Sequence, residues 1–160
     1  MEARTLVPTA LAVTATAVIG GLAGRPAESA WYQTLKKPPY QPPGRAFPIV
    51  WPVLYADIAA VSASTLSDLE RRGQRKEQRA YIVALATNLV LNASWSWLFF
   101  NRRRLGTSAV AAGVLAVSSA DLVRRSVAVR GAKAAPIAAY AAWTAFATAL
   151  STHIWVLNRG

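Results

Sequence analysis

Charged side chains are almost absent from five long stretches of this 160-residue chain, and this segregation constrains the fold more than any other feature of the sequence. The chain has 18 Lys and Arg and seven Asp and Glu, yet only Asp57 and Asp121 fall inside these stretches. The stretches are residues 6–24, 46–67, 80–101, 105–123 and 134–158. A soluble helical bundle, the alternative, would expose Ala and Val on outward faces that normally carry charges.

Each stretch is long enough to cross a membrane, because a helix needs about 20 apolar residues to span a hydrocarbon core of about 30 Å. Ala, Ser, Thr and Gly fill much of each stretch, and such small residues let helices in lipid approach closely. Residues 6–24 exceed the usual signal-peptide core of about 7 to 15 apolar residues, which favours a retained helix. The sequence therefore predicts an all-α integral membrane protein, a single domain over residues 1–160 with five transmembrane helices.

The basic residues lie in the connections, where anionic headgroups favour them. If the helices alternate in direction, the N-terminal side collects ten Lys and Arg and the other side eight, which favours a cytoplasmic N-terminus. The net charge of +11 is thereby explained by membrane-surface anchoring, so nucleic acid is not an expected partner. The absence of cysteine excludes disulfide scaffolds, thiolate metal sites and cysteine nucleophiles.

The connection between the first two stretches is rich in proline and aromatic residues. Four of the six residues 38–43 are proline, which fixes φ and removes backbone donors, so an extended segment is expected there. Trp31, Tyr32 and Tyr40 add amphipathic rings that suit the headgroup level. Two interpretations remain open, an interfacial linker and a lid over a cavity between helices.

Helical periodicity aligns aromatic and polar residues on three of the stretches. These faces are Trp51, Tyr55, Ile58 and Ser62; Asn88, Asn92, Trp95 and Phe99; and Trp143, Phe146, Leu150 and His153. Such stripes often serve core packing, but amide and indole groups in a bilayer need partners and suit a lined cavity. A planar, partly polar ligand would stack on the rings while anionic groups on it reached Lys36, Lys37 or Arg45 at the rim.

The order and spacing of these motifs resemble the TspO/translocator protein family of tryptophan-rich sensory proteins. The matching motifs are Trp31-Tyr32, Lys37-Pro38, Pro42-Pro43, Val50-Trp51, Leu54-Tyr55, Leu91-Asn92, Trp95, Ala142-Trp143 and Phe146. The resemblance implies a five-helix bundle, commonly a homodimer, in a bacterial cell membrane. It also implies that porphyrin or haem binds as a ligand, with no obligatory cofactor and no metal site.

The helical faces and the resemblance together place the ligand between helices, beneath the first connection. The expected ligand-binding residues are Trp31, Tyr32, Pro42, Pro43, Phe47, Trp51, Tyr55, Asn88, Asn92, Trp95, Phe99, Trp143, Phe146 and Leu150. Tyr40 stands where the family usually has Trp, and Asn88 replaces a familiar Gln. The stretch that corresponds to the family's sterol-recognition pattern, residues 150–159, has no central Tyr, which counts against sterol binding.

Three functions are compatible with these features. The first is a tetrapyrrole-binding sensor, carrier or scavenger. The second is a light- and oxygen-dependent enzyme that degrades porphyrin, with Trp51 and Trp143 as its catalytic residues; no nucleophile and base set is evident for conventional catalysis. The third is a proton-coupled transporter that uses Asp57, although five helices do not divide into equal inverted halves. His153 is expected to hydrogen-bond between helices rather than to ligate haem.

Overall fold

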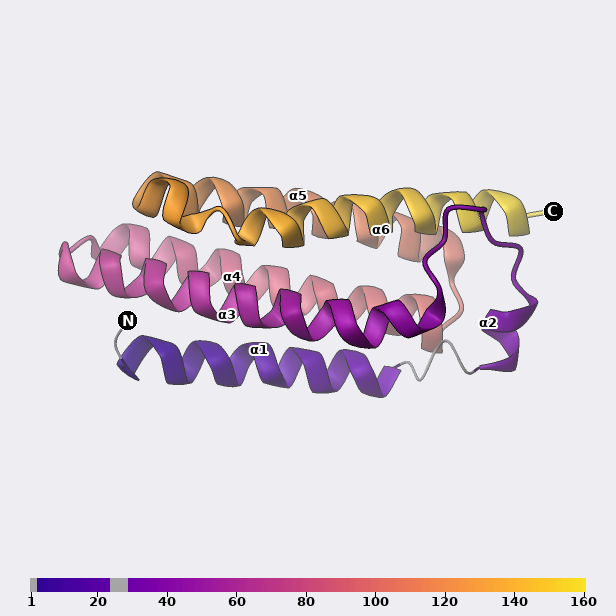
Figure 1. The fold of residues 1–160 in the computed structure, drawn as a ribbon, viewed down its shortest axis with the longest axis horizontal. Coiled ribbons are helices and arrows are strands. Elements are labelled where there is room, and N and C mark those ends of the chain that lie inside the picture. Colours follow the sequence, from indigo (N-terminus) through magenta and orange to yellow (C-terminus); the bar gives the residue numbers. More distant parts are fainter. Residues whose placement is uncertain (1–2, 24–28) are drawn as a thin grey trace.

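The computed structural model describes residues 3–23 and 29–160, which form helices and turns and no strand (Figure 1). The long helices are α1 (Ala3–Ala23), α3 (Phe47–Arg71), α4 (Arg75–Ser96), α5 (Leu105–Arg130) and α6 (Ile137–Asn158). The short ones are α2 (Ala30–Thr34), the 3₁₀ turns η2 (Gly44–Ala46) and η4 (Gly131–Ala134), and a π-helical turn η3 (Trp97–Asn101) that continues α4.

Four segments are long and apolar enough to cross a membrane. They are Ala3–Leu22, Gly44–Arg71, Arg75–Asn101 and Leu105–Ala134. These segments confirm the predicted all-α membrane architecture for the first four stretches. Helix α6 is as long as α4, at 22 residues, but Tyr140, His153 and several threonines lower its hydropathy, and it is not among the four. The predicted count of five crossings is therefore not confirmed.

Several helices extend beyond the predicted stretches, which followed apolar residues and so stopped where charges begin. Helix α3 continues to Arg71, α4 begins at Arg75 and α5 continues to Arg130, because Arg, Lys, Gln and Glu favour helix as strongly as apolar residues do. Gly73 ends α3 with a φ of 67°, and its N–H donates to the Glu70 carbonyl at 2.9 Å. Gly24, the predicted end of the first stretch, lies outside the described residues.

The helices lie side by side along one long axis (Figure 1). Helix α5 packs along α6, α4 packs on α5, and α1 packs on both α3 and α4. The N-terminal end of α1 lies with the α3–α4 and α5–α6 turns at one end of the bundle (Figure 1). The C-terminus, α2 and the first connection lie at the opposite end, so the connection can reach both α3 and the end of α6.

Several polar groups in the core are paired with one another across helices. The Tyr81 hydroxyl, on a side chain 1% exposed, donates to Ser62 Oγ at 3.0 Å and lies 2.9 Å from Ser126 Oγ. This phenol thereby links α4 to α3 and α5. Such pairing is required in a bilayer, where no water is available to satisfy a buried hydroxyl.

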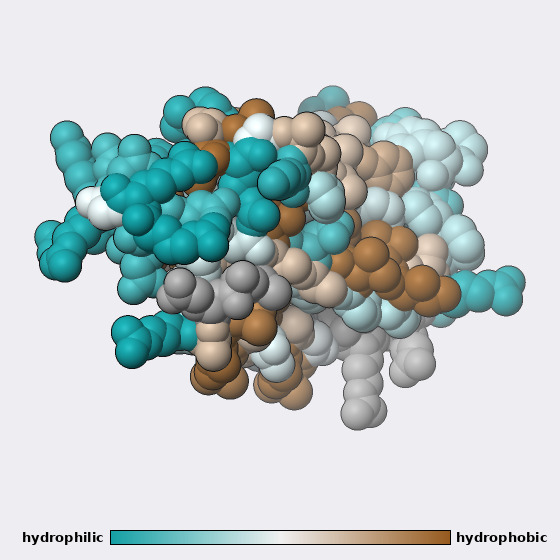
Figure 2. All heavy atoms as spheres, turned by 60° about the vertical axis from the view of Figure 1, so that its left-hand side comes forward, coloured by the Kyte–Doolittle hydropathy of each residue, from teal (hydrophilic) through white to brown (hydrophobic). Residues whose placement is uncertain are grey.

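The outer surface is apolar along the helices and hydrophilic at their ends. Figure 2 shows hydrophilic residues gathered at the end with the α3–α4 and α5–α6 turns, and hydrophobic patches along the flank. Large apolar side chains are exposed on several helices: Leu11 and Leu22 of α1, Val83 and Val90 of α4, and Val110 and Val117 of α5. This distribution suits a bundle surrounded by lipid.

Candidate ligand cavity

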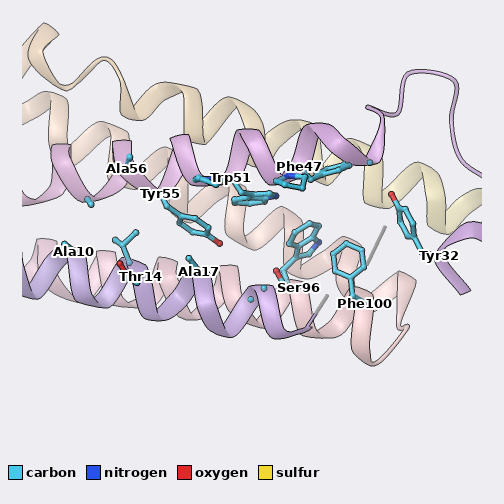
Figure 3. Close-up of a pocket in the computed structure, with 18 residues that line it drawn as sticks. Ala10, Thr14, Ala17, Tyr32, Phe47, Trp51, Tyr55, Ala56, Ser96 and Phe100 are labelled. Carbon is cyan, nitrogen blue, oxygen red and sulfur yellow. The ribbon is translucent and has the colours of Figure 1, made fainter. Parts of the chain in front are cut away.

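A cavity of about 590 Å³ lies between α1 and α3, which is within the range of about 300 to 1,000 Å³ typical of ligand pockets. Residues of α4, η3 and α2 also line it. Its lining comprises Ala10, Val13, Thr14, Ala17, Gly20, Gly21, Tyr32, Gly44, Phe47, Pro48, Trp51, Pro52, Tyr55, Ala56, Ala59, Trp95, Ser96 and Phe100. In Figure 3 the rings of Phe47, Trp51 and Tyr55 extend from α3 towards small residues of α1, with Tyr32 beyond one end.

The aromatic wall of the cavity is built by α3 and α4. Trp51 stacks on Tyr55 with ring centroids 5.5 Å apart, and Trp95 lies 6.2 Å from Trp51. The spacing of four residues from Trp51 to Tyr55 puts both on one face of α3, as the periodicity predicts. Aromatic faces of this kind suit a flat, largely apolar ligand.

The other predicted aromatic residues lie on the far side of Trp51. Phe99, Trp143, Phe146 and Leu150 line a cavity of only about 30 Å³, bounded also by Trp51 and Trp95. Trp143 meets Trp51 edge-on with ring centroids 6.4 Å apart, and it lies at a tilt to Phe146 with centroids 5.6 Å apart. The expected face of α6 is therefore tightly packed behind the wall and is not part of the larger cavity.

Asn88 and Asn92 are fully buried in a polar chain rather than exposed to the cavity. Asn92 accepts a hydrogen bond from the Tyr55 hydroxyl at 2.9 Å and donates to Tyr140 Oη at 3.0 Å. Asn88 accepts from Tyr140 at 2.8 Å and donates to Ser119 Oγ at 3.1 Å. Neither amide is among the residues that line the 590 Å³ cavity. Tyr55 is the member of this chain that reaches the cavity.

The first connection lies over the end of the bundle and is fastened to α6. The Lys36 backbone N–H donates to Asn158 Oδ1 at 3.0 Å, and Asn158 Nδ2 donates back to the Lys36 carbonyl at 2.8 Å. The Tyr40 hydroxyl lies 3.0 Å from His153 Nδ1. Residues 35–43 form no helix, as the prolines predict. His153 thus pairs with the connection, whereas the sequence suggested a partner on another helix.

Within the connection, Tyr32 is the predicted residue that reaches the cavity. Gln41 Nε2 donates to its hydroxyl at 2.6 Å, and the Lys37 ammonium lies 4.6 Å from the centre of its ring. Burial raises the pKa of the Tyr32 phenol above its ordinary value, and the Gln41 hydrogen bond partly offsets that shift. The phenol is therefore neutral at physiological pH. Lys37 brings a positive charge to this edge of the cavity.

Other predicted residues of the connection lie nearby without lining the cavity. Trp31 packs edge-on against Phe99 at 6.1 Å and beneath Arg103. Pro42 is partly buried, and Pro43 precedes η2 at the entrance to α3. Neither proline is a lining residue.

Helix α1 supplies one whole wall of the cavity, and sequence reasoning missed it. An added Cβ at Gly20 would lie 3.5 Å from Ser96 Oγ and 3.9 Å from Tyr55 Oη, so the absent side chain leaves both oxygens uncovered. The signal in the sequence was the run of small residues between Ala10 and Gly21, which also fits helix packing. Asp57, on α3, is partly buried and does not line the cavity.

These features define an all-helical integral membrane protein with an aromatic-walled cavity beside its first connection. A model of the TspO/MBR family matches residues 8–156, and the chain belongs to that family. It is 34% identical to the translocator protein of Ovis aries over 133 residues, covering 81% of this chain and 76% of the relative. It is 30% identical to the Bacillus subtilis membrane protein YtaB over 135 residues, 83% of each chain. The tryptophan-rich protein TspO of Bacillus cereus is 28% identical over 133 residues, 83% of this chain and 84% of the relative.

Proposed function

We propose that the protein binds tetrapyrrole ligands, porphyrin or haem, in the cavity between α1 and α3, as a sensor, carrier or scavenger. The observation that carries this proposal is a volume of about 590 Å³ walled by Phe47, Trp51, Trp95 and Phe100. A flat conjugated ring can stack against several of these side chains at once, and each such contact contributes about 0.5 to 1.5 kcal/mol beyond the burial of area.

The polar groups around the cavity also suit such a ligand. In the sequence, Arg45 lies between Gly44 and Phe47, which both line the cavity, and the Lys37 ammonium lies over the ring of Tyr32. Cations are therefore available to ligand carboxylates at the end of the cavity beside the first connection. The Trp95 indole N–H is buried and has no hydrogen-bond partner within residues 3–23 and 29–160. A buried donor of this kind is costly unless something satisfies it, and an acceptor atom of a bound ligand would do so.

An optical titration with protoporphyrin in detergent, in darkness, tests the proposal. Wild type is expected to shift and intensify the porphyrin absorption band saturably. Trp51→Ala removes the central ring of the wall and should weaken affinity about 3- to 10-fold, the equivalent of one lost aromatic contact. Trp155→Ala is the matched control, because Trp155 lies on α6 away from the cavity lining. An absence of saturable binding, or equal effects of the two variants, would contradict the proposal.

A second candidate function is light- and oxygen-dependent degradation of the bound porphyrin. Trp51 and Trp95 both line the cavity, with ring centroids 6.2 Å apart, and Trp143 lies behind Trp51 at 6.4 Å. An excited ligand would therefore face a cluster of oxidisable indoles. Illumination with oxygen should then bleach bound porphyrin faster than free porphyrin. Trp51→Phe and Trp143→Phe should slow bleaching more than they weaken binding in the dark. Bleaching that is indifferent to both tryptophans would leave binding as the function.

We also propose that α6 is a fifth membrane crossing and that the N-terminus is cytoplasmic. Helix α6 packs along α5, which is a candidate span, and carries no Asp, Glu, Lys or Arg. Its side chains at Ala142 and Ala145 are exposed on the isolated bundle, so lipid is expected to cover them.

Cysteine accessibility in open membrane fragments tests this crossing. A membrane-impermeant maleimide should label the Gln74→Cys variant readily, since Gln74 is exposed in the α3–α4 turn. It should label Ala145→Cys and Val117→Cys at least about 10-fold more slowly, because a thiol in hydrocarbon stays protonated and out of reach of the reagent. Val117 provides the control within a candidate span. Rapid labelling of Ala145→Cys alongside slow labelling of Val117→Cys would contradict a fifth crossing.

A further inference from the structure

The hydroxyl oxygens of Tyr55 and Ser96 lie beside Gly20 at the α1 side of the cavity. Each hydroxyl already donates its hydrogen to another group of the protein. The Tyr55 hydroxyl donates to Asn92 Oδ1 at 2.9 Å. The Ser96 hydroxyl donates to the Asn92 backbone carbonyl at 3.3 Å. A hydroxyl has a single proton to donate, so each oxygen presents only lone pairs to a ligand.

The direction of the Tyr55 hydrogen bond is set by the orientation of the Asn92 amide. If that amide were reversed, its NH₂ would face Tyr55 and the phenol proton would be free to point into the cavity. Asn92 Nδ2 instead donates to Tyr140 Oη at 3.0 Å. Tyr140 in turn donates to Asn88 Oδ1 at 2.8 Å, which leaves its oxygen free to accept from Asn92.

Ser119, on α5, is the far end of this series of hydrogen bonds and helps to set their direction. Its hydroxyl donates to the Leu115 carbonyl at 2.8 Å, so its oxygen accepts from Asn88 Nδ2, at 3.1 Å. Asn88 Nδ2 also donates to Ser118 Oγ at 3.2 Å. Ser119, Asn88, Tyr140 and Asn92 are all 0% exposed, so water cannot supply an alternative partner. In this arrangement every group in the series has a partner, and the Tyr55 proton points to Asn92, away from the cavity.

We propose that this chain makes Tyr55 and Ser96 an acceptor pair that selects ligands by an O–H or N–H donor. The ligand class that fits is a flat, apolar molecule with a donor beside Gly20 and with anionic groups directed towards Lys37 and Arg45. An ionised carboxylate has no proton to offer and would meet two lone-pair-bearing oxygens beside Gly20. Carboxylates are instead expected near Lys37 and Arg45. This inference rests on the proposed ligand cavity and adds what the cavity recognises.

The test compares haematoporphyrin, whose two hydroxyethyl groups are O–H donors, with its bis-methyl ether, in which a methyl group replaces each hydroxyl hydrogen. Dark optical titrations of wild type should favour haematoporphyrin by about 3- to 10-fold, the value of one neutral hydrogen bond. The double variant Tyr55→Phe, Ser96→Ala removes both acceptors and should bring this ratio to about one. A ratio that persists in the double variant reflects the bulk of the methyl groups and overturns the proposal.

Tyr140→Phe tests the chain itself, because Tyr140 does not line the cavity. Without its hydroxyl the Asn92 amide can reverse and Tyr55 can donate into the cavity, so the preference for haematoporphyrin should fall towards one. A purely structural role would weaken both ligands alike and keep the ratio. Tyr81→Phe is the matched control, since it removes a buried phenol that bonds Ser62 and Ser126 instead, and it should leave the ratio unchanged. An unchanged ratio in Tyr140→Phe contradicts the proposed polarity.

A second pair of probes separates this inference from the proposed tetrapyrrole ligand. Fluorescence titration with 2-naphthol and 2-methoxynaphthalene, corrected for partition into empty detergent, asks for the same donor preference without a tetrapyrrole. If neither porphyrin binds but the naphthol is preferred, tetrapyrrole binding fails and the acceptor pair stands. If porphyrins bind and neither pair shows a preference for the donor, the acceptor pair fails and the proposed function stands.

Discussion

Replacing Gly20 by phenylalanine is expected to abolish porphyrin binding while leaving the helical bundle intact. A side chain at this position begins 3.5 Å from Ser96 Oγ and 3.9 Å from Tyr55 Oη, so an aromatic ring would occupy the cavity itself. Ring and ligand cannot share the space, and affinity should fall by more than about 100-fold, or about 2.8 kcal/mol. The helix should tolerate the change, because Phe has a higher helix propensity than Gly.

Two further variants of α1 make this prediction specific. Val18→Phe places the same ring on an exposed position of the same helix that does not line the cavity, and affinity should change less than about twofold. Gly20→Ala adds a methyl group at ordinary contact distances and should keep most of the affinity. All three can be measured by porphyrin titration, with circular dichroism to verify the helices. Full binding by a folded Gly20→Phe variant would place the ligand elsewhere.

Truncation of Tyr140 should cause the largest loss of stability of any change considered. Its side chain is 0% exposed and packs in the core cluster with Ile58, Leu122 and Ile137. Tyr140→Ala removes the ring, which for a buried aromatic costs about 3 to 5 kcal/mol, and it also removes one hydrogen bond from each of Asn88 and Asn92. Tyr140→Phe keeps the ring and loses the hydroxyl, and should cost about 1 to 2 kcal/mol.

The free energy of unfolding can be measured by titration with sodium dodecyl sulfate in mixed micelles, followed by circular dichroism. Trp155→Ala is the reference, since Trp155 is 37% exposed on the same helix and its loss should cost less than the loss of the fully buried Tyr140. The difference between the two Tyr140 variants separates ring packing from hydrogen bonding. A Tyr140→Ala variant as stable as Trp155→Ala would show that this polar chain does not stabilise the bundle.

Charge segregation and residue periodicity were sufficient to predict the helices and their approximate positions. They located Trp51 and Tyr55 on one face of α3, and Trp95 on the face of α4 that meets it. Periodicity describes one helix at a time, however, and does not say which neighbour faces a stripe. The stripe of α6 with Trp143 and Phe146 proved to be packed behind the wall, against Trp51 and around a cavity of about 30 Å³.

The wall contributed by α1 was harder to predict because its residues are small. Ala, Gly and Thr give no sign of whether a second helix or a ligand lies against them, since both uses need the same absence of bulk. The buried amides show the same limit. Asn88 and Asn92 lie one helical turn apart, as the spacing requires, but only the positions of Tyr140 and Ser119 on other helices determine which way each amide points.

The reciprocal hydrogen bonds between Lys36 and Asn158 also bear on how the protein is made. The two residues are 122 positions apart, and Asn158 is the last residue of α6. A chain synthesised from its N-terminus holds α1, α3 and the aromatic wall well before α6 emerges. The first connection can be fastened to Asn158 only after α6 has been synthesised. A nascent chain that has not yet reached Asn158 therefore has the aromatic wall but lacks the two hydrogen bonds that hold the first connection over the end of the bundle.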